Sequence, residues 1–235
     1  MSGDLYILTL DDMQQSAVDL SDPTRLVFDY VRRIGDVIDA MPSRPPSPLR
    51  VLHVGGAAMT LARYVAVTRP RSAQIVLEPS AELIEKVRAE APLPPRSGIK
   101  VRPVDGMSGI KVVRDGSQDV VVLDAFAGGV VPDELTSPAF IEEVRRVLAP
   151  GGAFIANLVD KPPFPRARSF VATARDLGVG AIGVEPSTMK GRRAGNVIVV
   201  SGGVPATPFG RPSPMEYRVF EGGAVADSFG GGKPG

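Results

Sequence analysis

The sequence of 235 residues lacks cysteine and tryptophan and contains a single histidine, His53. The lack of cysteine excludes disulfides, thiolate zinc sites and cysteine nucleophiles. A Ser-His-Asp triad or a multi-histidine metal site would have to be built around His53 alone, so we expect no metal cofactor. His53 lies inside an apolar run, where we predict a packed histidine with a satisfied ring.

The chain also lacks an excess of charge of either sign and any long apolar run. Its 27 Lys and Arg residues against 26 Asp and Glu residues leave a net charge of +1. That balance predicts no nucleic-acid partner. No apolar run reaches the roughly 18 residues of a membrane span, and the N-terminus shows no secretory pattern. We therefore expect a cytoplasmic protein with no membrane partner.

Residues 1–48 are expected to form a short N-terminal segment with a strand, a helix and a linker. The run 5–10 predicts a strand, and the polar residues 11–20 predict a turn. A cap residue followed by proline, and then apolar residues at helical spacing, predict a helix over 22–41. The proline-rich run 42–48 predicts a stiff linker.

Residues 49–201 alternate between strand-like and helix-like segments. The strand-like runs are rich in Val, Ile and Leu, which is typical of strands covered on both faces. This alternation predicts an α/β fold with a mostly parallel, seven-stranded sheet. We expect residues 202–235, rich in Gly and Pro, to form an irregular tail. The predicted strands are 49–54, 73–78, 99–104, 118–124, 152–158, 180–185 and 196–201, and the predicted helices are 57–68, 80–91, 106–114, 137–148 and 165–177.

The residues that end each strand are the candidates for a binding site, because ligands of open parallel sheets bind outside the carboxyl ends of the strands. Gly55 and Gly56 follow the first strand and let the backbone turn tightly beside a ligand. Glu78 ends the second strand, 22 residues beyond Gly56. A carboxylate at this distance is placed to accept hydrogen bonds from both ribose hydroxyls. The alternative is a solvated glutamate at a strand end.

The third and fourth strands also end in acidic residues. Asp105, followed by Gly106, either faces an adenine amino group or caps the next helix, and the residues alone favour neither role. Asp124 follows a run of apolar residues and is expected at the mouth of the cleft, with a turn or cap role as its alternative. Three carboxylates at three successive strand ends together indicate a ligand site more strongly than any one of them.

These strand ends, together with the N-terminal segment, resemble the spermidine synthase family of polyamine aminopropyltransferases over roughly residues 5–200. The segments that carry the resemblance are Leu10–Ser16, Val51–Gly56, Asp124–Val144, which includes the matching run Phe140–Val144, and Leu148–Gly152. The segment Leu148–Gly152 is shared by many S-adenosylmethionine enzymes.

The resemblance implies a methyltransferase-like Rossmann fold with a truncated N-terminal β element, usually in a homodimer. It also implies that decarboxylated S-adenosylmethionine is the co-substrate and that an amine is the acceptor. Glu78 would match the ribose-binding acid, Asp105 the acid that contacts adenine, and Gln15 the glutamine that faces the nucleoside. Asp124 would match the aspartate that accepts a proton from the attacking amine.

Several positions depart from the pattern of the family. Ala58 replaces the aspartate of the glycine loop that binds the aminopropyl amine, and Ala127 replaces the second aspartate of the active-site loop. Val27-Phe28 stand where the family has Tyr-His. Recognition of a polyamine normally needs several carboxylates. A hypothesis is that Phe126 and Phe164 line the acceptor pocket instead and that the acceptor is less charged than putrescine.

Three functional hypotheses follow from these residues. The first is a divergent aminopropyltransferase, favoured by Asp124 and the turn that carries Gln15. The second is a methyltransferase that uses intact S-adenosylmethionine, because Ala58 removes a carboxylate that would repel the carboxyl group of that cofactor. The third is a non-catalytic dimeric protein, because the second aspartate is missing. We place the first slightly ahead.

Overall fold

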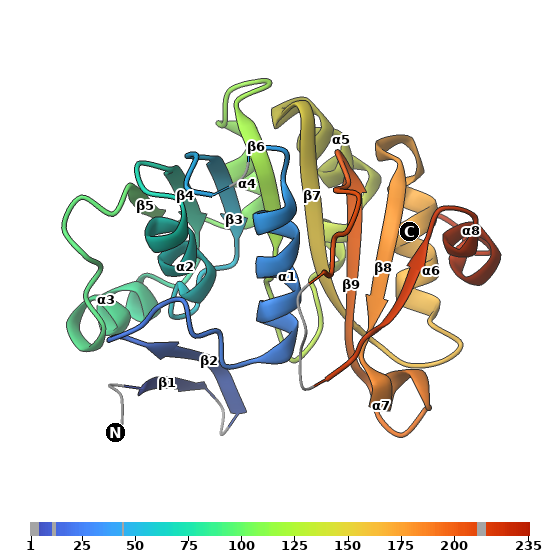
Figure 1. Cartoon of the computed structure of the whole chain (residues 1–235), viewed down its shortest axis with the longest axis horizontal. Coiled ribbons are helices and arrows are strands. Elements are labelled where there is room, and N and C mark those ends of the chain that lie inside the picture. The colour runs from blue at the N-terminus through green and yellow to red at the C-terminus, as the bar shows by residue number, and fades with distance from the viewer. Residues whose placement is uncertain (1–4, 11–12, 44, 211–214) are drawn as a thin grey trace.

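The centre of the molecule is an eight-stranded sheet, seen in a computed structural model that describes residues 5–10, 13–43, 45–210 and 215–235. Five neighbouring strands run parallel, and the strands at one end of the sheet pair antiparallel (Figure 1). Across the sheet the order is β10 (Arg218–Glu221), β8 (Val179–Val184), β9 (Gly195–Gly202), β7 (Leu148–Asp160), β6 (Gln118–Leu123), β3 (Arg50–Val54), β4 (Ala73–Leu77) and β5 (Ile99–Arg102).

Helices cover both faces of this sheet. Successive strand residues point to opposite faces, so Val51 packs in one core and Leu52 in the other, and both are fully buried. Figure 1 shows α1 crossing the near face of the sheet. The helices are α1 (Asp29–Ala40), α2 (Thr60–Thr68), α3 (Ala81–Glu90), α4 (Gly106–Lys111), α5 (Pro138–Val147), α6 (Pro165–Thr173), α7 (Pro186–Met189) and α8 (Gly223–Phe229), with short 3-10 turns η1 (Asp133–Thr136) and η2 (Arg175–Leu177).

Each of the seven predicted strands is present, with ends shifted by a few residues. Their apolar runs fill both cores, which is the physical reason that the sequence pattern identified them. The predicted linker 42–48 lies between α1 and β3, and its residue 44 is outside the described part of the chain.

The N-terminal segment differs from the prediction in two places. The residues from 13 onward are not a turn but the strand β2 (Met13–Asp19), which pairs antiparallel with β1 (Leu5–Leu10). The helix begins at Asp29 rather than at residue 22, because Asp19 Oδ1 accepts hydrogen bonds from the backbone N–H groups of Ser21 and Asp22 and folds that segment into a turn. Residues 11 and 12 lie outside the described residues.

The C-terminal residues are more ordered than the predicted irregular tail. They supply β10, the eighth strand, and helix α8. The ring of Phe229 lies 5.2 Å from the ring of Phe220 and 5.5 Å from that of Phe164, measured between centroids. Burial of these rings offsets the weak local preference of a Gly- and Pro-rich segment. Within the ranges that the structure describes, no helix is long and apolar enough to cross a membrane.

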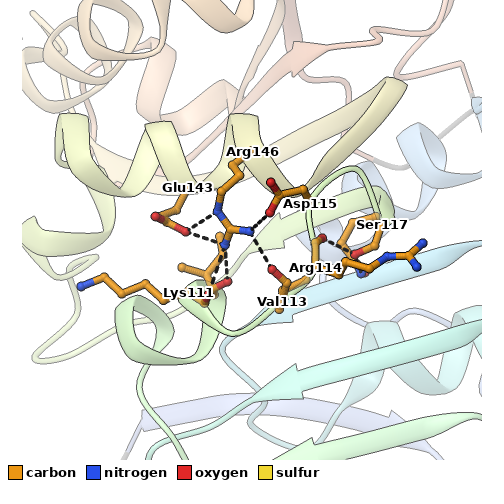
Figure 2. Close-up of polar contacts among 9 residues, drawn as sticks. Lys111, Val113, Arg114, Asp115, Ser117, Glu143 and Arg146 are labelled. Atoms are coloured by element: carbon orange, nitrogen blue, oxygen red, sulfur yellow. Dashed lines mark hydrogen bonds and ion pairs between the residues drawn. The ribbon is translucent and has the colours of Figure 1, made fainter.

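Arg146 on α5 fixes the position of α4, whose first residues face the site described below. Figure 2 shows its guanidinium between Glu143, Asp115 and the carbonyl oxygen of Val113. It donates to the carbonyl oxygens of Val113 at 2.8 Å and of Ile110 at 3.0 Å. The last carbonyls of a helix lack partners within the helix, and here Arg146 adds its charged donors beside the backbone N–H of Val113, which also reaches the Ile110 carbonyl oxygen.

We expect the substitution Arg146→Ala to lower the free energy of unfolding by about 2–3 kcal/mol, because it leaves several carbonyls and Glu143 without their charged donor. Arg146→Lys should recover little, since an ammonium group cannot reach all these acceptors at once. Urea unfolding measures the loss. Arg145→Ala is the control, because Arg145 pairs only with the exposed Glu142 among the described residues. An equal loss in both variants would contradict the account.

Candidate functional site

A cavity of about 710 Å³ opens at the carboxyl ends of β3, β4 and β6. Strand β2 and the start of α1 border it on the side of the N-terminal segment. The seven residues predicted as site residues all lie along this one cavity. They are Gln15, Gly55, Gly56, Glu78, Asp105, Gly106 and Asp124.

The loop after β3 brings the strand ends together. Gly55 has φ +97°, and a Cβ at this position would lie 2.2 Å from the carbonyl oxygen of Asp124, so only glycine fits. Its N–H donates to the carbonyl oxygen of Leu77 at 2.9 Å. Ala57 and Met59 also adopt positive φ, an uncommon conformation that costs free energy in residues with a side chain. The loop is thus held in a strained, close approach to both neighbouring strands.

The carboxylate of Glu78 is held against this loop. It is 8% exposed, and Oε2 accepts hydrogen bonds from the N–H groups of Gly56 at 3.1 Å and Ala57 at 3.3 Å. Oε1 accepts a hydrogen bond from the N–H of Ser80. The alternative of a solvated glutamate is therefore wrong. A carboxylate has about four lone-pair sites, and three of them are occupied here, so about one remains to accept a hydrogen bond from a ligand hydroxyl.

Asp105 caps α4, which is one of the two roles that the sequence predicts for it. Its Oδ1 accepts a hydrogen bond from the N–H of Ser108 at 2.7 Å, and this bond, followed by one from the Ser108 side chain, lowers the pKa of the carboxyl. Its place on the cavity leaves the second role, contact with adenine, as a prediction. The neighbouring Gly106 is buried, and a Cβ there would lie 2.5 Å from a methyl of Val54. A larger residue would push α4 away from the sheet.

Asp124 has a desolvated carboxyl group at the end of β6. Its backbone N–H donates to the carbonyl oxygen of Val54 at 2.9 Å, and its Oδ1 accepts a hydrogen bond from Nδ2 of Asn157 at 2.9 Å. Burial raises the pKa of Asp124 to about 6, although the bond from Asn157 acts in the opposite direction. The pKa of Tyr30 also rises well above its ordinary value, through burial and then through the charge of Asp124.

Asn157 and Tyr30 are cavity residues that sequence reasoning missed. Asn157 interrupts the otherwise apolar centre of β7, and this lone amide in a buried strand was an available signal. Tyr30 falls within the apolar stripe that predicts the N-terminal helix. The local sequence does not distinguish a tyrosine that packs in the core from one that lies beside Asp124.

The carboxylates that line the cavity outnumber its cations. Only Lys86 contributes a positive side chain among the described lining residues. The field of such a cavity favours a cationic ligand. The lining carboxylates are Glu78, Glu82, Asp105, Asp124 and Glu134.

The predictions for other residues have mixed outcomes. His53 is packed, as predicted: its Nε2 lies 2.9 Å from Oε1 of Gln74, and burial lowers its pKa to about 4. Phe126 lines the cavity, whereas the prediction for Phe164 is wrong, because its ring packs on Phe229. Ala58 is fully buried in a cluster with the β1–β2 hairpin.

Ala58 is not among the described lining residues, so its small size does not enlarge the cavity directly.

Among all the residues that the structure describes, no group of three or more His, Cys, Asp or Glu side chains is arranged to hold a metal ion.

Sequence comparison gives weak but consistent relatives. No protein-family model matches the chain. The polyamine aminopropyltransferase of Chromobacterium violaceum is 29% identical over 144 residues, which are 61% of this chain and 53% of that protein. The chain thus spans about half the length of this curated relative.

Solved structures extend the likeness over the whole chain. A probable spermidine synthase from Corynebacterium glutamicum is 29% identical, with a TM-score of 0.89 over 99% of this chain and 88% of that one. A spermidine synthase in complex with the transition-state analogue AdoDATO has a TM-score of 0.63 over 95% of this chain and 77% of that one. At 15% identity the second likeness concerns the fold alone. The predicted methyltransferase-like Rossmann fold is confirmed.

The desolvation of Asp124 has a consequence for stability. Its folded pKa of about 6 exceeds the ordinary 3.8, so the stabilisation it contributes is complete below pH 3.8 and is lost as the pH rises through 6. We expect Asp124→Asn to raise the free energy of unfolding at pH 8 by about 1–3 kcal/mol. The gain should shrink as the pH falls through 6, which urea unfolding across this range measures.

Asp119, near the start of the same strand, is the matched control. It pairs with Arg50, which lowers the pKa of this carboxyl, and its Oδ2 accepts the Arg50 backbone N–H. Asp119→Asn should therefore lose stability at pH 8, the opposite sign to Asp124→Asn. A loss of similar size in both variants would show that Asp124 is a structural anchor rather than a strained carboxylate.

Proposed function

We propose that the chain, which is similar in sequence and fold to spermidine synthases, binds an S-adenosylmethionine-type nucleoside and transfers the aminopropyl group of decarboxylated S-adenosylmethionine to an amine. One observation carries the proposal. A desolvated carboxylate, Asp124, lies on the same cavity as the strained glycine loop and the loop-bound Glu78.

The nucleoside half of the site is assigned to the strand ends. Glu78 accepts a hydrogen bond from the ribose, and Asp105 accepts one from the adenine amino group. Gln15, which lines the cavity from β2, is assigned to face the nucleoside. Gly55 and Gly56 permit close approach of the loop backbone, and Gly106, also on the cavity, is assigned to the same half.

The reacting half is assigned to Asp124. The lone pair of a neutral amine attacks the methylene carbon bound to the sulfonium, the carbon–sulfur bond breaks, and methylthioadenosine leaves with that electron pair. The new ammonium then gives a proton to the Asp124 carboxylate. A carboxyl with a pKa of about 6 is ionised at neutral pH yet accepts a proton more readily than a solvated one. The sulfonium already activates the carbon, so this step needs no metal.

The comparisons support the proposal at a coarser level. Curated relatives are polyamine aminopropyltransferases, and one structural neighbour holds AdoDATO, an analogue of the transition state. The excess of carboxylates over cations on the cavity suits a sulfonium ligand. The amine acceptor, the homodimer and the cytoplasmic location stay predictions.

Methylthioadenosine tests the nucleoside half alone, because it carries the adenine and ribose without the amino-acid arm. We expect micromolar binding by calorimetric titration and a loss of at least about tenfold in Glu78→Ala, which removes the proposed ribose acceptor. Glu85→Ala is the control, since Glu85 lies on the neighbouring α3 and pairs with Arg88 away from the cavity. No binding at millimolar ligand would end both enzyme hypotheses.

The pH dependence tests the role of Asp124. Activity should rise as the pH passes through about 6, where the carboxyl ionises. Asn157→Leu removes the hydrogen bond that lowers this pKa, so the acid limb of kcat/KM should move to higher pH. Asn196→Leu changes an amide elsewhere on the cavity and should leave the limb in place. An unchanged limb in Asn157→Leu would argue that another group accepts the proton.

A further inference from the structure

The cavity beside Asp124 has mostly apolar and aromatic walls. Phe28 and Tyr30, at the start of α1, stack with their ring centroids 6.0 Å apart, and burial followed by the charge of Asp124 raises the pKa of Tyr30. Phe126 follows Asp124 by two residues, and Val159 follows Asn157 by two residues on the same face of β7. An acceptor body seated here would contact the rings of Phe28, Tyr30 and Phe126 and the methyl groups of Val159.

Asp124 is the only carboxylate in this half among the described lining residues. The other lining carboxylates lie on the end of β4, on α3, before α4 and on η1, and we assign these elements to the nucleoside half. A second ammonium group buried against the aromatic wall would have no carboxylate partner among the described lining residues of this half. Burial of an unpaired cation costs several kcal/mol. This half therefore selects against a dication.

Asn157 provides a second hydrogen-bond acceptor beside Asp124. The side chain is 0% exposed and lines the cavity, and its Nδ2 donates to Asp124. Its Oδ1 accepts no hydrogen bond from the described residues. A buried acceptor without a partner costs about 1–3 kcal/mol, so a ligand donor at this point relieves that cost. Two adjacent acceptors match the two N–H bonds of a primary amine.

We propose that the acceptor is a primary monoamine with an apolar body, its nitrogen held between Asp124 and Asn157 Oδ1 and its body against Phe28, Tyr30 and Phe126. The inference rests on the proposed aminopropyl transfer. In the step, one N–H proton passes to Asp124 after the new carbon–nitrogen bond forms. The other N–H stays on Asn157 Oδ1, and methylthioadenosine leaves.

Matched acceptors test the proposal on the full chain with decarboxylated S-adenosylmethionine. Pentylamine and 1,5-diaminopentane have equal length and differ in the second charge. We expect kcat/KM for methylthioadenosine release to be at least about tenfold higher with the monoamine. Ala127→Asp, at an exposed position on the cavity, should narrow or reverse this ratio by supplying a carboxylate. A diamine preference in the unmodified chain would overturn the inference and leave the transfer reaction standing.

Phenethylamine and its N-methyl derivative test the role of Asn157. The primary amine should be preferred, and Asn157→Leu should remove that preference while methylthioadenosine binds unchanged. Equal use of both amines by the unmodified chain would contradict the assignment of Oδ1.

If no amine releases methylthioadenosine, the proposed transfer fails, and calorimetry on the methylthioadenosine-loaded protein then decides the acceptor class. Tighter binding of pentylamine than of the diamine supports the inference. Tighter binding of the diamine overturns the inference, and so does equal or undetectable binding of the two amines.

Discussion

The contact between Gly55 and the backbone of Asp124 is the constraint on which the site depends. A Cβ at Gly55 would lie 2.2 Å from the Asp124 carbonyl oxygen, so the ends of β3 and β6 meet only because this residue has no side chain. The same loop offers its N–H groups to Glu78. One glycine thus places the proposed ribose acid and the proposed proton acceptor on a single cavity.

A second feature follows from where β6 ends. Its apolar run carries Asp124 into a desolvated position, and the amide of Asn157 on β7 supplies its hydrogen bond. The cost in stability and the raised pKa have the same cause, which is burial of a carboxyl with one donor. Strain of this kind is typical of sites that act on protons.

Most of the fold and of the site outline was predictable, because the local pattern carried the information. Buried parallel strands are continuous apolar runs, and their ends fall at polar residues such as Glu78 and Asp124, so the strands and the cavity residues could be found together. The roles of these residues could not be predicted in the same way. A carboxylate at a strand end can cap a helix as well as contact a ligand, and Asp105 does cap α4.

The misses lie where distant partners decide the structure. Residues of β2 look polar and turn-like alone, but pairing with β1 and the hydrogen bond of Ser16 to Thr60 at 2.7 Å stabilise a strand. The ordered tail depends on Phe229 packing against the ring of Phe164, which is far away in sequence. By contrast, the lone amide Asn157 could have been recognised from the sequence.

The most direct test is a crystal structure with decarboxylated S-adenosylmethionine. The account predicts that Glu78 accepts a hydrogen bond from the ribose and that the reacting methylene faces Asp124. A nucleoside whose methylene points away from Asp124 would contradict it.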